Sequence, residues 1–233
     1  MLEVNEINTF YGGAHILHDV SITLGENEVV ALLGRNGAGK STTMKSIMGL
    51  ARPKTGRITY EGADVQKLPS HEICRLGIGY VPEERRIFSE LTVMENLEVG
   101  RRAARPGSPE WEPEKLFDLF PNLKERRDHP GGRLSGGEQQ MLTIARTLMG
   151  NPHMVLLDEP SEGIAPVIVE QMAFVINELK REGLSIVISE QNLHFAKLVS
   201  DRAYVIETGT VRYDGSFEDL EANPEVSEKY LAV

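Results

Sequence analysis

The chain has 233 residues, with 25 Lys and Arg against 35 Asp and Glu, which gives a formal net charge of −10. A hydrophobic content of 40% and a charged content of 26% are typical of a globular protein and argue against global disorder. The acidic balance disfavours nucleic-acid binding, which needs clustered Lys and Arg. No apolar run approaches the roughly 20 residues of a transmembrane helix, and no signal peptide is evident. The single cysteine excludes an internal disulfide framework.

The N-terminal residues predict an antiparallel flap followed by a buried strand. Leu2–Asn8 and Ile16–Leu24 show a partial alternation of apolar and polar residues, and Tyr11-Gly12-Gly13 separates them as a turn. The apolar run at 28–33 comes next and is bounded by glycine at 34. A short run of this kind is typical of a strand that is covered on both faces.

A phosphate-binding motif follows this strand directly. The segment 34–41, GRNGAGKS, matches GxxxxGK followed by Ser, and a predicted helix comes after it. Its glycines let successive backbone N–H groups point at one anion, and the helix N-terminus adds positive potential. In this motif Lys40 reaches the β- and γ-phosphates, and the Ser41 hydroxyl ligates Mg²⁺. The alternative, a glycine-rich turn with a solvated lysine, leaves the complete motif unexplained. The predicted phosphate-binding residues are Gly34, Arg35, Asn36, Gly37, Ala38, Gly39, Lys40, Ser41 and Thr42.

Residues 92–150 contain no convincing strand and predict a helical insertion. Within it, the segment 134–140, LSGGEQQ, opens a helix with Ser135 as N-cap and Glu138 three residues later, which is a capping box. The capping box leaves Gly136 and Gly137 unexplained, because glycine costs up to ~1 kcal/mol relative to alanine inside a helix. The glycine pair suggests that another group approaches the backbone closely, and a phosphate is the natural candidate.

The strands at 154–157 and 185–189, with an amphipathic helix at 166–182 between them, form a βαβ unit and indicate a parallel sheet. Asp158 and Glu159 end the first of these strands. A carboxylate there, beside a phosphate loop, can hold the Mg²⁺ shell, which assigns Asp158, and Glu159 can act as general base on the attacking water. Two solvated carboxylates at a strand end are the alternative interpretation.

The order of these three motifs, the phosphate loop, LSGGEQQ and the acidic strand end, resembles the ATP-binding cassette (ABC) ATPases over essentially the whole chain. The resemblance implies an α/β fold, with a RecA-like P-loop core, an N-terminal antiparallel β subdomain and a helical insertion. It implies one domain over 1–233, with a nucleotide-binding core at 1–82 and 151–215, a Q-loop and helical subdomain at 83–150, and a short helical tail at 216–233. Tyr11 looks like the aromatic residue that stacks on adenine.

In this family two cassettes pair head to tail, and the signature segment of one closes over the γ-phosphate that the other binds. The resemblance therefore assigns Ser135, Gly136, Gly137 and Glu138 to ATP binding as well.

Three positions depart from the common cassette, and one of them is Ala165, where many cassettes have Asp. The Q-loop glutamine is replaced by Glu83, which can still ligate Mg²⁺ because that ion prefers oxygen. The switch histidine is replaced by Gln191, a neutral amide that can hydrogen-bond a phosphate but cannot be cationic. With these changes the chain is similar to the LivF-like ATPases of branched-chain amino-acid importers. We expect Lys40, Glu159 and Gln191 to be the catalytic residues, and the two ATP sites of a heterodimer to be unequal.

The resemblance implies ATP and Mg²⁺ as ligands and a subunit that powers an importer. Its implied partners are a second cassette (LivG-like, or another copy of this chain), two membrane permeases and, indirectly, a periplasmic binding protein. The implied location is the cytoplasmic face of the inner membrane, held through the permeases. The rival reading is a soluble ABC-type ATPase of an assembly scaffold, of the kind used in iron–sulfur biogenesis. The transported solute, whether amino acid, urea, amide or aromatic acid, is not encoded in these motifs.

Overall fold

The computed structural model describes residues 1–107 and 109–222. A six-stranded sheet forms its centre, in the strand order β10-β9-β3-β8-β7-β6. The pairs β9–β3, β3–β8, β8–β7 and β7–β6 are parallel, and β10 is added antiparallel at one edge. Its strands are β3 (Val29–Leu33), β6 (Ile78–Val81), β7 (Met154–Asp158), β8 (Ser185–Glu190), β9 (Arg202–Glu207) and β10 (Thr210–Gly215).

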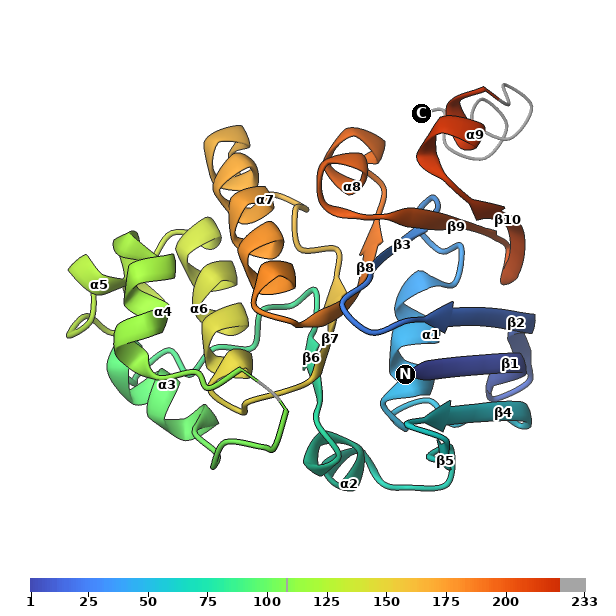
Figure 1. The fold of residues 1–233 in the computed structure, drawn as a ribbon, viewed down its shortest axis with the longest axis horizontal. Coiled ribbons are helices and arrows are strands. Elements are labelled where there is room, and N and C mark those ends of the chain that lie inside the picture. The colour runs from blue at the N-terminus through green and yellow to red at the C-terminus, as the bar shows by residue number, and fades with distance from the viewer. Residues whose placement is uncertain (108, 223–233) are drawn as a thin grey trace.

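A second, antiparallel sheet of order β2-β1-β4-β5 confirms the predicted flap. Its strands are β1 (Leu2–Tyr11), β2 (Ala14–Leu24), β4 (Thr55–Tyr60) and β5 (Ala63–Asp64). In Figure 1 this sheet lies on one side of the parallel strands, and the helices α3 to α6 lie on the other. The α/β class, with a parallel sheet in the core and an antiparallel sheet beside it, is therefore as predicted. The strands β4, β5, β6, β9 and β10 carry no clear signal in the sequence.

Both faces of the parallel sheet are buried, which explains its continuous apolar runs. Along β3, Ala31 and Leu33 pack into the core on the side of the helical subdomain, and Val30 and Leu32 pack into the core beneath the antiparallel sheet. Helices cover the two faces: α1 (Lys40–Ile47), α2 (Ser70–Arg75), α7 (Pro166–Arg181), α8 (Leu193–Val199) and α9 (Phe217–Glu221). No helix among the described residues is long and apolar enough to cross a membrane.

The predicted helical insertion lies between β6 and β7. It contains α3 (Val93–Gly100), α4 (Pro113–Leu119), α5 (Pro121–Glu125), the short 3₁₀ turn η1 (Gly131–Arg133) and α6 (Gly136–Leu148). Thr92 starts α3 with a full capping box, in which its side chain accepts from the N–H of Glu95. Of the predicted helical tail at 216–233, α9 is present, and residues 223–233 lie outside the described part of the chain.

Candidate functional site

The phosphate loop connects β3 to α1, and the lysine side chain folds back into it. Gly39 has φ +117°, a left-handed value that favours glycine, and directly precedes α1. Lys40 donates through Nζ to the carbonyl oxygens of Gly34 at 2.6 Å and Arg35 at 3.0 Å. The exposed tip 35–37 borders a pocket of about 320 Å³ together with residues 206–208. Ser41 and Thr42 occupy the first turn of α1, where both are half-buried.

The two predicted catalytic groups Lys40 and Glu159 form an ion pair, with Nζ and Oε1 2.9 Å apart. Gln191, which follows β8, donates through Nε2 to Oε2 of Glu159 at 3.0 Å and to Oδ1 of Asn36 at 2.7 Å. Lys40, Glu159 and Gln191 are thus together, as the sequence predicts. Lys40 follows β3, Gln191 follows β8 and Glu159 follows β7. These three strands are neighbours in the sheet, so the β–α loops at their ends meet.

Asp158 is buried at the end of β7 and accepts three hydroxyl hydrogen bonds. Ser41 Oγ donates to its Oδ1 at 3.0 Å, and Ser189 Oγ donates to the same oxygen at 2.7 Å. Tyr80 OH donates to Oδ2 at 3.0 Å. Burial, the charge of Asp158 and this hydrogen bond raise the pKa of Tyr80, so that the phenol keeps its proton. The contacts of Ser189 and Tyr80 are not predictable from the sequence motifs.

The residues present fit a magnesium ion that is shared with phosphate. Ser41 and Asp158 bring a hydroxyl and a carboxylate to within 3.0 Å of each other, and Mg²⁺ takes such oxygens together with phosphate and water. The described residues contain no group of three or more His, Cys, Asp or Glu arranged to hold a metal by themselves. Glu83 is exposed at the end of β6 and makes no hydrogen bond to Ser41 or Asp158 in the described structure, so its metal role stays a prediction.

Several carboxylates share this edge of the sheet, and their pKa values move apart. Burial raises the pKa of Glu83, and the negative charges of Glu159 and Asp158 raise it further. A side-chain hydrogen bond between Glu162 and Glu159 is the main reason that the pKa of Glu162 rises to about 7. Burial opposes ionisation of Glu159, but the hydrogen bonds from Glu162, Lys40 and Gln191 lower its pKa. The pKa values of Glu159 and Glu162 therefore move in opposite directions, which the position of Glu162 in a polar loop does not reveal.

Tyr11 ends β1 at the tip of the flap and is 49% exposed. Backbone hydrogen bonds attach the flap to the phosphate loop. The N–H of Gly209 donates to the carbonyl of Ala38 at 2.7 Å, and the N–H of His18 donates to the carbonyl of Gly209 at 2.7 Å. The exposed aromatic ring thus belongs to a strand pair that is fixed beside the phosphate loop, as an adenine-stacking role requires.

The signature segment begins α6 with the predicted capping box. Ser135 N–H donates to Glu138 Oε2 at 2.7 Å, and Glu138 N–H donates to Ser135 Oγ at 3.3 Å. The described structure offers a further reason for the glycine pair, because neighbouring side chains lie close to both positions, and the approach of a phosphate stays a prediction. A Cβ on Gly136 would lie 2.7 Å from Nη1 of Arg85, and one on Gly137 would lie 2.8 Å from Cγ2 of Ile168. The assignment of these four signature residues to ATP binding stays a prediction.

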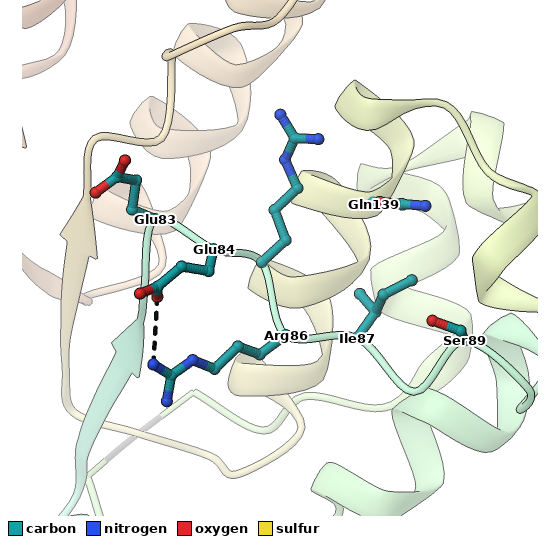
Figure 2. Close-up of a pocket in the computed structure, with 7 residues that line it drawn as sticks. Glu83, Glu84, Arg86, Ile87, Ser89 and Gln139 are labelled. Carbon is teal, nitrogen blue, oxygen red and sulfur yellow. Dashed lines mark ion pairs between the residues drawn. The ribbon is translucent and has the colours of Figure 1, made fainter.

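The Q-loop forms a pocket of about 400 Å³ between the core and the helical subdomain. Figure 2 shows Glu84 paired with Arg86, with Oε2 and Nη2 3.4 Å apart, and Gln139 on the facing helix α6. Arg85 and Arg86 have φ values of +63° and +46°, unusual for non-glycine residues. Hydrogen bonds to their carbonyls from Thr143 Oγ1 at 2.6 Å and Arg146 Nη2 at 2.7 Å stabilise this turn.

A glycine-rich loop around a buried lysine, beside a carboxylate at the end of a neighbouring parallel strand, is the arrangement of P-loop nucleotide hydrolases. A profile of the ABC transporter family matches residues 17–162. The chain belongs to this family, and it is a nucleotide-binding ATP hydrolase that is coupled to transport.

Known proteins are similar over the full length. The chain is 44% identical to the high-affinity branched-chain amino acid transport ATP-binding protein BraG of Pseudomonas aeruginosa, over 99% of each chain. It is 37% identical to the lipopolysaccharide export system ATP-binding protein LptB of Haemophilus influenzae, over 99% of this chain and 97% of LptB. A nucleotide-free ATP-binding cassette from an ABC transporter superposes with a TM-score of 0.84 and 29% identity, over 98% of this chain and 97% of that one. The resemblance to branched-chain importer ATPases is thereby confirmed.

Proposed function

We propose that the chain is the ATP-hydrolysing subunit of an importer for branched-chain or other hydrophobic amino acids. The observation that carries this proposal is the 44% identity to BraG over the whole chain. Glu83 and Gln191, two of the departures from the common cassette, agree with the same subfamily. The similarity to LptB makes lipopolysaccharide export the second candidate. A soluble assembly-scaffold ATPase is the third, and the transport relatives disfavour it.

In the proposed reaction the chain's own residues bind the triphosphate and direct water to it. The N–H groups of the phosphate loop and Lys40 bind the β- and γ-phosphates, for which Lys40 exchanges its partner Glu159 for phosphate oxygen. Ser41 and Asp158 would hold Mg²⁺, which neutralises phosphate charge when bound. Tyr11 stacks on the adenine.

Glu159, once released by Lys40, takes a proton from the attacking water. The water oxygen forms a bond to the γ-phosphorus, and the bond from that phosphorus to the bridging oxygen of ADP breaks. Gln191 keeps Glu159 oriented through its hydrogen bond at 3.0 Å. The signature segment of a partner cassette would complete the site from the opposite side, as Ser135 and Gly136 of this chain would do at the partner's site.

Transport then follows from dimer closure, because ATP prefers the closed pair of cassettes and so shifts the population towards it. The pocket at the Q-loop is our proposed contact with the permease. Phe88, which lies in sequence between the lining residues Ile87 and Ser89, is exposed, and the guanidinium of Arg146 lies 5.0 Å from its ring centre. These contacts would hold the chain at the cytoplasmic face of the membrane, with a second cassette beside it and a periplasmic binding protein on the other side.

Purification of the tagged chain from detergent-solubilised membranes of its own cells tests the proposal. We expect two polytopic permeases and a second cassette, and ATP hydrolysis by this complex that rises when binding protein loaded with leucine, isoleucine or valine is added. Recovery with lipopolysaccharide-export components, or with soluble scaffold proteins alone, would contradict import. A Glu159→Gln chain is the matched control, since it should recover the same partners without the hydrolysis.

A further inference from the structure

A buried carboxylate that the proposed chemistry does not use lies between three loops of the site. Glu190 is the last residue of β8, and its exposed fraction is 2%. Its Oε1 accepts the backbone N–H of Ser161 at 3.0 Å. Its Oε2 accepts the backbone N–H groups of Gln191 at 3.2 Å and Asn192 at 3.4 Å. Its own carbonyl accepts the N–H of Gly34 at 3.3 Å.

We infer that Glu190 is a positioning residue that links the nucleotide-sensing end of the site to the loop 161–165, which precedes α7. The N–H of Gly34 in the phosphate loop donates to the backbone carbonyl of Glu190. The backbone N–H of the switch residue Gln191 donates to one carboxylate oxygen, and the backbone N–H of Ser161 donates to the other. A displacement of Gln191 when phosphate binds is therefore transmitted through one rigid side chain to the loop at Ser161.

The side chain of glutamate suits this role better than that of glutamine or aspartate. A carboxylate has two oxygens and about four lone-pair sites, so it can accept from both loops at once. A glutamine of the same shape has one oxygen, and its NH₂ group would face a backbone N–H on one side. An aspartate keeps both oxygens but lacks the methylene that lets it reach both loops. Burial raises the pKa of Glu190, and hydrogen bonds from Ser161 and from the N–H groups of Asn192 and Gln191 oppose that rise.

Nucleotide binding can act on this arrangement through the side chain of Gln191. Gln191 donates to Asn36 of the phosphate loop at 2.7 Å and to Glu159 at 3.0 Å, so nucleotide binding at this loop must rearrange its side chain. The inference rests on the proposed function for the output, since the loop at Ser161 faces a partner cassette in the proposed dimer. Glu190 then reports the occupancy of this chain's site to the surface that the partner contacts.

Backbone hydrogen exchange of the full chain, with and without the β,γ-imido analogue of ATP, tests the link residue by residue. In the unaltered chain we expect the analogue to slow exchange at the phosphate loop, at Gln191 and at Ser161 together. In Glu190→Gln the phosphate loop should still respond, while the response at Ser161 falls at least several-fold. The value of kcat should fall about 10-fold with KM for ATP unchanged, since one charge-assisted hydrogen bond is lost.

Glu28→Gln is the matched control. Glu28 also accepts a backbone N–H, from Gly25 at 2.6 Å, and pairs with Arg202 at 2.7 Å, but it lies at the opposite end of β3 from the phosphate loop. This variant should keep the unaltered response at Ser161.

An equal response of Ser161 in Glu190→Gln would overturn the inference. The inference would also be overturned if, in the unaltered chain, the analogue slowed exchange at the phosphate loop but not at Ser161. This second measurement does not depend on whether a variant folds. A phosphate loop that does not respond at all would instead contradict the ATP site.

Discussion

Lys40 and Glu159, the phosphate-binding cation and the proposed general base, neutralise each other across 2.9 Å with side-chain exposures of only 2% and 6%. A buried pair of this kind leaves an uncompensated charge if either member is removed alone. In the proposed reaction, this contact holds the carboxylate of Glu159 until a phosphate competes for Lys40. This exchange gives the site a physical reason to hydrolyse only when the nucleotide is in place.

Lys40→Met should lower both stability and nucleotide affinity. Removing one member of a buried ion pair costs about 3–5 kcal/mol, because the carboxylate of Glu159 then lacks its cation. Urea unfolding would measure the loss, and calorimetric titration with ATP the affinity. Adding Glu159→Gln to Lys40→Met should restore part of the stability but none of the affinity. Additive losses of stability in this double-mutant cycle would contradict a direct pair.

The carboxyl pair Glu159 and Glu162 predicts a pH dependence. The pKa of Glu162 is raised to about 7 in the folded chain, above the ordinary glutamate value of 4.5. The folded state thus binds more protons than the unfolded state between these two values, and its stability falls as pH rises through this window. Glu162→Gln removes this pH-dependent contribution to stability. The melting temperature of the variant, relative to that of the unaltered chain, should therefore rise from pH 5 to pH 8. A constant difference across that range would contradict the raised pKa of Glu162.

Gln191 is expected to act through orientation. Gln191→Ala removes its hydrogen bond to the carboxylate of Glu159, so kcat in the assembled transporter should fall about 10-fold or more while KM for ATP changes little. Steady-state rates over a range of ATP concentrations would show it. We also expect the isolated chain to hydrolyse ATP more slowly than the complex, because its partner site is missing. If the isolated chain hydrolysed ATP as fast as the complex, the hypothesis of two unequal, interdependent ATP sites would be wrong.

Tyr11 should contribute affinity for the base. Tyr11→Ala should weaken ATP binding about 10-fold, since stacking of one base on an aromatic ring contributes about 1–3 kcal/mol, whereas Tyr11→Phe should bind as the unaltered chain does. Fluorescence titration with a labelled ATP analogue separates the two variants. Equal affinities would show that Tyr11 is a surface residue of the turn and does not contact adenine.

The parts of the site that lie on one continuous segment could be predicted from the sequence. Residues 34–42 form a local motif whose backbone shape depends on their own glycines, and the capping box at Ser135 and Glu138 spans a single turn. The order of strand, helix and strand at 154–189 could also be predicted, because an apolar run followed by a helical period is typical of a covered parallel sheet.

The parts that depend on pairing of distant strands could not be predicted. Tyr80 reaches Asp158 only because β6 pairs in parallel with β7, which sets Tyr80 opposite Leu156. The four-residue strand β6 is too short to show a period. Glu159, whose carboxyl group interacts with that of Glu162, has a left-handed φ of +45°, which no propensity indicates at a glutamate. In the sequence, Glu190 likewise looks like an ordinary strand residue. Only the structure shows that three backbone N–H groups donate to its carboxylate.

The central claim is that Glu159 serves as the base for ATP bound at Lys40, and hydrolysis by the assembled transporter carrying Glu159→Gln tests it most directly. Release of phosphate should be followed at saturating ATP, with nucleotide occupancy measured on the same sample. The account predicts full occupancy and a rate lower by about 10²–10⁴-fold, the usual contribution of a positioned general base. Full occupancy with the unaltered rate would contradict it.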